Sequence, residues 1–164
     1  MESKKERDLS IGLVAYFYDP SSFSKLFNYF NVSNDYETCN GTDTTIEIRD
    51  VSYENLKELL KIKDETVPYL IDVRNRSEIV ETYLLPKAVN VPLHELNEAF
   101  RLPKDKFQEK YGKYKAEKSH SNLIIYCRSG ARAVEGYRCL YSMGYINIKR
   151  YKGSYLEWNE RLEQ

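Results

Sequence analysis

Six consecutive residues carry the clearest chemistry in this sequence. They combine one thiol with two cations and a glycine: Cys127, Arg128, Ser129, Gly130, Ala131 and Arg132. A cysteine thiolate is a strong nucleophile, and nearby cations and unpaired backbone amides stabilise it. Glycine permits the backbone angles of a tight turn, so the amides of residues 128–132 can curl into a cup. The segment therefore predicts a nucleophilic Cys127 in an anion-binding loop.

The flanking residues place this loop at the end of a strand and the start of a helix. Residues 122–126 read Asn-Leu-Ile-Ile-Tyr, a short apolar run typical of a buried parallel strand. From residue 133 onward, apolar side chains recur at helical spacing. Ligands of open parallel sheets bind beyond the carboxyl ends of the strands. The positive end of the following helix adds to the charges of Arg128 and Arg132. We therefore expect an anionic sulfur that a small donor can reach.

Strand and helix patterns alternate along most of the chain. Strands are predicted at 46–48, 69–73, 88–91, 122–126 and 146–151. Helices are predicted from Ser52, at 77–82, across 93–112 with a division at Pro103, from 133, and at 155–162. This alternation predicts an α/β fold, a parallel sheet with helices on both faces.

Residues 1–44 differ from the rest and are predicted to be a partly helical N-terminal extension of a domain that spans 45–164. Asp19 and Pro20 can begin a short helix there. Its four large apolar residues, at 23, 26, 27 and 30, share one face. That face would either dock on the main domain or bind a partner.

Composition narrows the classes of function. The 164 residues contain 25 Lys or Arg and 25 Asp or Glu, so the formal charge is zero and no basic stripe indicates a nucleic acid. No apolar run is long enough to span a membrane. Acidic residues around the short apolar run near the N-terminus disfavour a secretory signal, so we expect a cytoplasmic protein, with a mitochondrial location as the alternative.

The cysteines and histidines indicate that only one thiol has a chemical role. Three cysteines with no short-range pairing motif favour a reducing compartment over a disulfide framework. Cys139 lies off the main apolar face of its helix and is expected either to pack or to be partly exposed, and Cys39 lies in the extension. Only two histidines are available, so we predict no metal site and no cofactor. His94 is expected at the surface near the start of a helix.

Four segments, in this order, resemble the rhodanese-like domain family. They are Leu70-Ile71-Asp72-Val73-Arg74, then Ala88-Val89-Asn90-Val91-Pro92-Leu93, then Ile125-Tyr126 with the cysteine loop, and finally Lys152-Gly153 followed by Trp158. The resemblance covers roughly residues 45–163, and the cysteine loop is its most specific part.

The resemblance implies a single rhodanese-like domain with a central parallel sheet of five strands. It also implies that Cys127 forms a persulfide, that the backbone of the loop binds the transferred sulfur, and that Asp72 and Arg74 support the site, mainly by ordering loops. Where the family often has Gly-His-Ile-Pro-Gly-Ala, this chain has Tyr83-Leu84-Leu85-Pro86-Lys87-Ala88. A glycine pair usual near the end is replaced by Lys152-Gly153.

Three functions fit these residues, and a sulfurtransferase fits best. A cysteine phosphatase or arsenate reductase would also use a thiolate and an arginine, but its loop usually holds five residues between them. Here four residues separate Cys127 from Arg132, and a shorter loop suits one sulfur atom better than a tetrahedral group. A non-catalytic interaction module of the same fold is the third possibility.

The expected mechanism is a double displacement. The thiolate takes the outer sulfur of thiosulfate or a similar donor, and a thiol acceptor then removes it. Cyanide would serve in the test tube, and glutathione, thioredoxin or a small carrier protein in the cell. Arg128 and Arg132 are expected to orient the anionic donor.

Overall fold

The predicted alternation of strands and helices is confirmed in a computed structural model, which describes residues 45–64 and 67–162. In chain order the elements are β1 (Asp50–Val51), α2 (Tyr53–Leu60), β2 (Tyr69–Asp72), α3 (Arg76–Val80), β3 (Ala88–Asn90), the 3₁₀ helix η1 (Leu93–Glu95), α4 (Leu96–Arg101), α5 (Lys104–Tyr111), β4 (Leu123–Tyr126), α6 (Ala131–Ser142), β5 (Lys149–Tyr151) and α7 (Ser154–Leu162). The helix predicted near Pro20 lies outside the described residues. None of the described helices is long and apolar enough to cross a membrane.

The described strands form one parallel five-stranded sheet in the order β1-β5-β4-β2-β3. The central strand β4 pairs with β2 so that Tyr126 lies opposite Asp72. The amide of Val73 continues this ladder by donating to the carbonyl of Tyr126 at 3.0 Å. The loops that follow β2 and β4 therefore begin side by side at the carboxyl edge of the sheet. This adjacency places the Asp72–Arg74 segment next to the cysteine loop.

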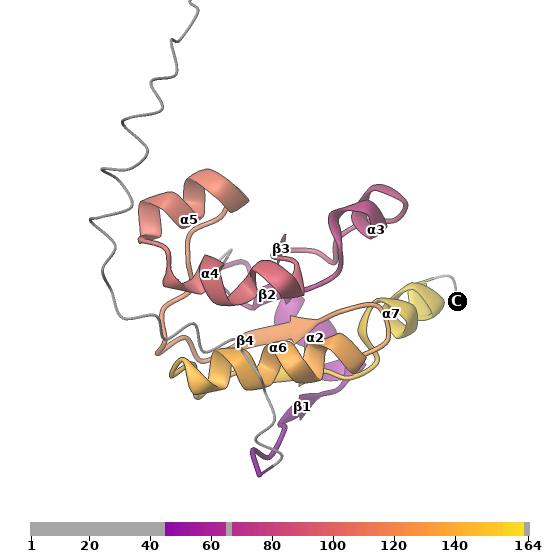
Figure 1. The fold of residues 1–164 in the computed structure, drawn as a ribbon. Helices are drawn as coiled ribbons and strands as arrows, with labels where there is room; N and C mark the ends of the chain where they lie inside the picture. Colours follow the sequence, from indigo (N-terminus) through magenta and orange to yellow (C-terminus); the bar gives the residue numbers. More distant parts are fainter. Residues whose placement is uncertain (1–44, 65–66, 163–164) are drawn as a thin grey trace, which may run out of the picture. The chain divides into compact units, whose positions relative to one another are not determined.

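Alternating side chains of β4 divide the core between the two faces of the sheet. Leu123 and Ile125 are buried on the face that α4, α5 and α6 cover, and α6 runs along β4 in Figure 1. Ile124 and Tyr126 are buried on the opposite face with residues of α2 and α7. Because Cys127 continues the alternation, its side chain belongs to the α6 face. The direction of the Cys127 side chain thus follows from the strand that precedes it.

Most predicted elements agree with the structure within two residues, and the first strand is the main difference. The strand predicted at 46–48 is not formed, and β1 lies at Asp50–Val51 instead. Ile46 and Ile48 are partly buried against the α6-side core, so their alternation is real. Only from Arg49 does the backbone meet β5, through the amide of Arg150, which donates to the Arg49 carbonyl at 2.8 Å. The alternation of apolar residues at 46–48 therefore reflects alternating burial and not a strand.

Lys87 has a left-handed backbone with φ of 62°, at a position where the resemblance leads one to expect glycine. A side chain in this region of backbone angles costs free energy. The Lys87 ammonium compensates by donating to the carbonyls of Ile62, Asp64 and Val67, at 2.6, 2.9 and 3.0 Å. These bonds tie the turn before β3 to the segment after α2. A lysine thus stands where glycine is expected, and its hydrogen bonds hold the turn in place.

We expect Lys87→Met to lower the free energy of unfolding by about 1–3 kcal/mol, because it keeps the strained backbone and leaves carbonyl groups without their donor. Lys87→Gly loses the same bonds but removes the strain, so it should be less destabilising than Lys87→Met. Urea unfolding of the two variants and the unchanged chain measures both effects. A glycine variant less stable than the methionine variant would contradict this explanation.

Candidate active site

Cys127 follows β4 directly and is almost completely covered, with 1% of its surface exposed. The strand alternation turns its side chain toward α6, where it joins the core cluster on that face of the sheet. The sulfur is therefore more enclosed than the expectation of an easily reached thiolate suggested.

The loop nevertheless turns a backbone amide onto the sulfur. The N–H of Gly130 donates to Cys127 Sγ at 3.1 Å. Gly130 has φ of 93°, and a Cβ at this position would overlap the carbonyl oxygen of Lys152. Both the backbone angle and the close approach require glycine. Gly130 is also the N-cap of α6 without a side-chain cap, so the first amides of that helix keep their capacity to bind an anion.

Residues at the start of α7 hold the other side of the loop. The amide of Tyr155 donates to the carbonyl of Cys127 at 3.1 Å, and the amide of Leu156 donates to that of Arg128 at 3.0 Å. In a trans peptide the N–H points opposite to the C=O. The amides of Arg128 and Ser129 therefore point away from α7. The loop thus has a carbonyl side that faces α7 and an amide side that is free to form a cup.

Ser154 is a further support that sequence reasoning missed. Its buried hydroxyl accepts the amide of Cys127 at 3.3 Å and donates to the carbonyl of Tyr151 at 2.9 Å. Ser154 has φ of 56°, a left-handed conformation. Its place one residue after the Lys152-Gly153 turn was the available signal, but nothing in the sequence linked it to a cysteine 27 residues earlier.

The two arginines of the loop, which the sequence analysis treated alike, have different surroundings. Arg132 forms a bidentate ion pair with Glu78 of α3, with Nη1–Oε2 and Nη2–Oε1 distances of 2.6 and 2.8 Å. This hydrogen bonding is the main reason that the pKa of Arg132 is raised, and the nearby Cys127 contributes less. The charge of Arg132 is thus largely neutralised by Glu78, whose role the sequence did not reveal.

Arg128, by contrast, is exposed and has no ion pair among the described residues. It borders a small hollow, which we call the loop pocket, of about 160 Å³. The residues that line this pocket are Arg74, Glu78, Glu81, Thr82, Arg128 and Tyr155. Ser129 and Ala131 are also exposed at the loop surface. Arg128 is the loop residue best placed to meet an incoming anion.

Asp72 and Arg74 form a buried ion pair behind the loop pocket. The Arg74 side chain is 1% exposed, and its Nη2 lies 2.7 Å from Asp72 Oδ2. Arg74 also donates to the hydroxyl of Thr82 at 3.0 Å and to the carbonyl of Tyr83 at 2.8 Å. Its guanidinium lies over the Tyr155 ring, 4.3 Å from the centroid. The pair therefore ties the segment after α3 and the start of α7 to the end of β2, which fits a supporting role.

Another cation near the cysteine comes from the neighbouring strand. Arg150 of β5 lies opposite Ile125 in the sheet, so it shares the face on which Cys127 lies. Its Nε donates to Asp50 Oδ1 at 2.7 Å, which is the main cause of its raised pKa, and the charge of Cys127 adds to the shift. No sequence pattern pointed to Arg150, because only strand pairing brings it close to the cysteine.

Cys139 and His94 do not enter the site. Cys139 is 2% exposed on α6 and is disulfide-bonded, which the cysteine spacing did not predict. Cys39 lies outside the described residues. His94 has a side chain 69% exposed, which confirms its expected surface position. No group of three or more His, Cys, Asp or Glu side chains within residues 45–64 and 67–162 could hold a metal ion.

The Glu78–Arg132 pair should make stability depend on acid pH. The hydrogen bonds from Arg132 hold the pKa of Glu78 at about 2, below its ordinary 4.5. The pair therefore stabilises the folded chain fully above about pH 4.5 and loses its effect as the pH falls toward 2. We expect Glu78→Gln to cost about 1 kcal/mol at pH 7, as for a partly buried bidentate pair, and nothing near pH 2.

Unfolding curves of the unchanged protein and of Glu78→Gln across this pH range measure the difference in the free energy of unfolding. Glu81→Gln is the matched control, since Glu81 is an exposed carboxylate one turn further on with no ion pair among the described residues. A Glu78→Gln effect that is the same at pH 7 and pH 2 would show that the pair is not its origin.

Comparisons with known proteins identify a family and relatives of this chain. The family model described as "Rhodanese-like domain" matches residues 52–161. The chain is 41% identical over 110 residues to "Rhodanese domain-containing protein CG4456" of Drosophila melanogaster, covering 67% of this chain and 96% of that protein. It is 34% identical over 123 residues to "Thiosulfate:glutathione sulfurtransferase" of Saccharomyces cerevisiae, covering 73% and 86%.

A solved structure described as "Human Single Domain Sulfurtranferase TSTD1" matches with a TM-score of 0.63 and 31% identity, covering 70% of this chain and 97% of that one. The family match covers most of the part of the chain that the structure describes, and strands β2 to β5, the cysteine loop and the Asp72–Arg74 pair lie within it. Sequence, fold and site agree on one conclusion: this chain belongs to the rhodanese-like domain family.

Proposed function

We propose that the protein is a sulfurtransferase that carries a sulfane sulfur as a persulfide on Cys127. The observation that carries this proposal is the Gly130 amide, which donates to Cys127 Sγ at 3.1 Å from a loop in which the amides of Arg128 and Ser129 face away from α7. Such an arrangement stabilises a negative charge on sulfur, first on the thiolate and then on the persulfide. No metal or redox cofactor is needed, because both steps are displacements at sulfur.

Thiosulfate is the proposed donor. The Cys127 thiolate attacks its outer sulfur, the sulfur–sulfur bond of thiosulfate breaks, and sulfite leaves with the electron pair. An acceptor thiolate then attacks the terminal sulfur of the persulfide, and Cys127 returns as a thiolate. Each step forms one sulfur bond and breaks one, so no oxidant or reductant is consumed.

Glutathione is the proposed small acceptor, with thioredoxin or a carrier protein as the alternative. The relative from Saccharomyces cerevisiae is named as a thiosulfate:glutathione sulfurtransferase, which supports this pair of substrates for the present chain. We retain the cytoplasm as the predicted compartment, with the mitochondrion as the alternative.

The geometry favours sulfur transfer over phosphoryl transfer. A phosphatase needs an arginine that grips the oxygens of a tetrahedral group. Here Arg132 is occupied by Glu78, and Cys127 is 1% exposed. A single sulfur atom fits such an enclosed position better than a phosphoryl group with three oxygens.

The first test is intact mass spectrometry after incubation with thiosulfate. The unchanged chain should gain one sulfur atom, and cyanide or glutathione should remove it. Cys127→Ser should show no gain, because a hydroxyl cannot form the persulfide. The double variant Cys39→Ser/Cys139→Ser is the matched control, since it leaves Cys127 as the single cysteine and should still gain the sulfur.

Two outcomes would contradict the proposal. One is a sulfur gain that persists in Cys127→Ser, which would place the persulfide elsewhere. The other is hydrolysis of an aryl phosphate by a chain that gains no sulfur, which would indicate the phosphatase chemistry.

Arg128 should set the affinity for the anionic donor. We expect Arg128→Gln to raise KM for thiosulfate about tenfold, because it removes one charge-assisted contact of roughly 1.4 kcal/mol, while the stability of the fold changes little. Arg128→Lys keeps the charge and should recover most of the affinity. Steady-state kinetics with cyanide as acceptor measure both variants, and an unchanged KM in Arg128→Gln would refute this role.

A further inference from the structure

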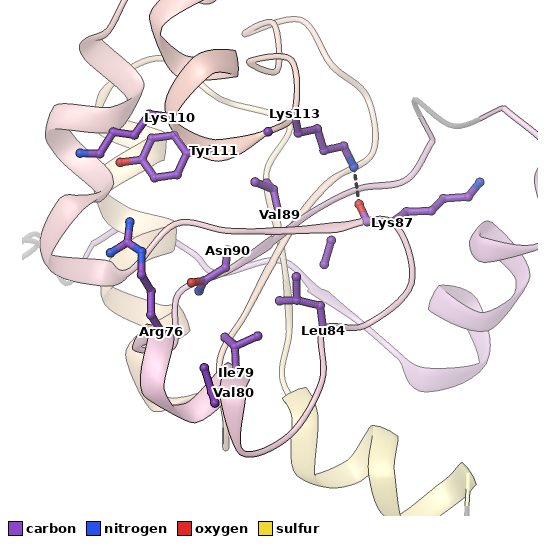
Figure 2. Close-up of a pocket in the computed structure, with 12 residues that line it drawn as sticks. Arg76, Ile79, Val80, Leu84, Lys87, Val89, Asn90, Lys110, Tyr111 and Lys113 are labelled. Atoms are coloured by element: carbon purple, nitrogen blue, oxygen red, sulfur yellow. Dashed lines mark hydrogen bonds between the residues drawn. The ribbon is translucent and has the colours of Figure 1, made fainter. Parts of the chain in front are cut away.

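A second hollow, larger than the loop pocket, lies at the β3 edge of the sheet. It has a volume of about 570 Å³ and lies between α3, β3 and the end of α5 (Figure 2). We call it the basic groove. Its main lining residues combine cations with apolar side chains: Arg76, Val80, Leu84, Val89, Lys110 and Lys113. These side chains make no contact described above with the cysteine loop or with the residues that support it. The groove and the loop are connected through the backbone of α3.

Positive charge gathers on one side of the basic groove. Arg76 Nη2 and Lys110 Nζ lie 2.9 and 3.2 Å from the same Glu95 carboxylate oxygen, which also accepts the Tyr111 hydroxyl at 3.0 Å. Hydrogen bonding from Arg76 is the main reason that the pKa of Glu95 falls to about 2, so this carboxylate stays charged at neutral pH. One carboxylate between two cations leaves a net positive charge.

Two lysines contribute differently to this field. Lys113 adds a third cation, whose ammonium donates to the carbonyl of Lys87. The Lys87 side chain itself points away from the groove in Figure 2, toward the carbonyls that follow α2. The groove therefore carries Arg76, Lys110 and Lys113 against the single charge of Glu95.

The side of the groove across from Lys110 is apolar. Ile79, Val80 and Leu84 lie along it, and Val89 lies between the two sides (Figure 2). Val80 is 87% exposed, the largest exposed fraction among the large hydrophobic residues that the structure describes. An exposed valine beside half-buried apolar neighbours is typical of a surface that another molecule covers. A small anion would use the cations but would leave this apolar side unused.

The groove adjoins the cysteine loop through α3. Ile79 and Val80 of this helix line the groove, while Glu78 of the same helix binds Arg132 and lines the loop pocket. Glu81 and Thr82, which follow directly, also line the loop pocket. A molecule that fills the groove therefore lies one short helix away from the loop pocket that Arg128 borders.

We propose that the basic groove docks a segment with alternating acidic and apolar residues, carried by a protein whose thiol accepts the sulfur from Cys127. This inference rests on the proposed function and names the docking surface of its protein acceptor. Charge complementarity selects the acidic residues, and Val80 with its neighbours selects the apolar ones. A small thiol needs only the loop pocket, whereas a protein-borne thiol gains from a second contact beside it.

The test uses two peptides as acceptors for the full chain loaded with sulfur. One reads Val-Glu-Ile-Glu, followed by a flexible Gly-Ser linker and a terminal Cys, and the other has Gln in place of Glu. We expect the acidic peptide to have a severalfold higher kcat/KM. Lys110→Gln should lower its kcat/KM about threefold, as for one exposed charge pair. Lys110→Gln combined with Val80→Ser should remove the preference entirely.

The matched control is Lys106→Gln, which makes the same charge change on the same helix. Lys106 is exposed, pairs with Glu109 and does not line the groove. It should leave the peptide preference unchanged. Transfer to glutathione should stay the same in all three variants, since none of these residues lines the loop pocket.

Three results would overturn the docking surface: equal rates for the two peptides, a preference that survives the double substitution, or a parallel fall in transfer to glutathione. A chain that gains no sulfur at all would refute the proposed function instead. In that case a serine version of the acidic peptide still tests the groove through amide NMR shifts. Shifts at Val89 and Asn90 that vanish in the double variant support docking, and their absence refutes it.

Discussion

Backbone hydrogen bonds between the start of α7 and the cysteine loop are the constraint on which the site depends. The amides of Tyr155 and Leu156 donate to the carbonyls of Cys127 and Arg128. These bonds determine the direction in which the amides of the loop point. Ser154 fixes the Cys127 amide in the same turn. The conformation of the cysteine loop therefore depends on α7, which lies far from it in the sequence. The charge pattern around the sulfur follows from this arrangement more than from any single side chain.

The sequence predicted the parts of the fold that depend on interactions between residues close together in the chain. The apolar run before Cys127, the glycine and the helix pattern after it are contiguous, so strand, loop and helix could be placed to within two residues. The first strand was misplaced because Ile46 and Ile48 alternate in burial without a strand beside them. The left-handed backbone of Lys87 was also beyond prediction, because the carbonyls that stabilise it come from another segment.

The parts of the site that were not predicted depend on contacts distant in sequence. Glu78 lies 54 residues before Arg132, and only the pairing of β2 with β4 brings α3 close to the loop. Because of this contact, Arg128 and Arg132 have different surroundings, although they look equivalent in the sequence. Arg132 pairs with Glu78, whereas Arg128 stays exposed to solvent. Asp72 and Arg74 form a buried pair with bonds to Thr82 and Tyr83, and their role in ordering the surrounding loops stays a prediction.

The short helix α3 contains no buried residue, so polar contacts rather than core packing hold it in place. Its bond to the loop is an ion pair between partly exposed side chains, and dissolved salt weakens such pairs. Raising the ionic strength should therefore loosen α3 while the sheet keeps its packing. Because α3 forms one wall of both hollows, the loop pocket and the basic groove would change shape together. Salt concentration would then act on the hollow beside Arg128 and on the hollow beside Val80 through one element.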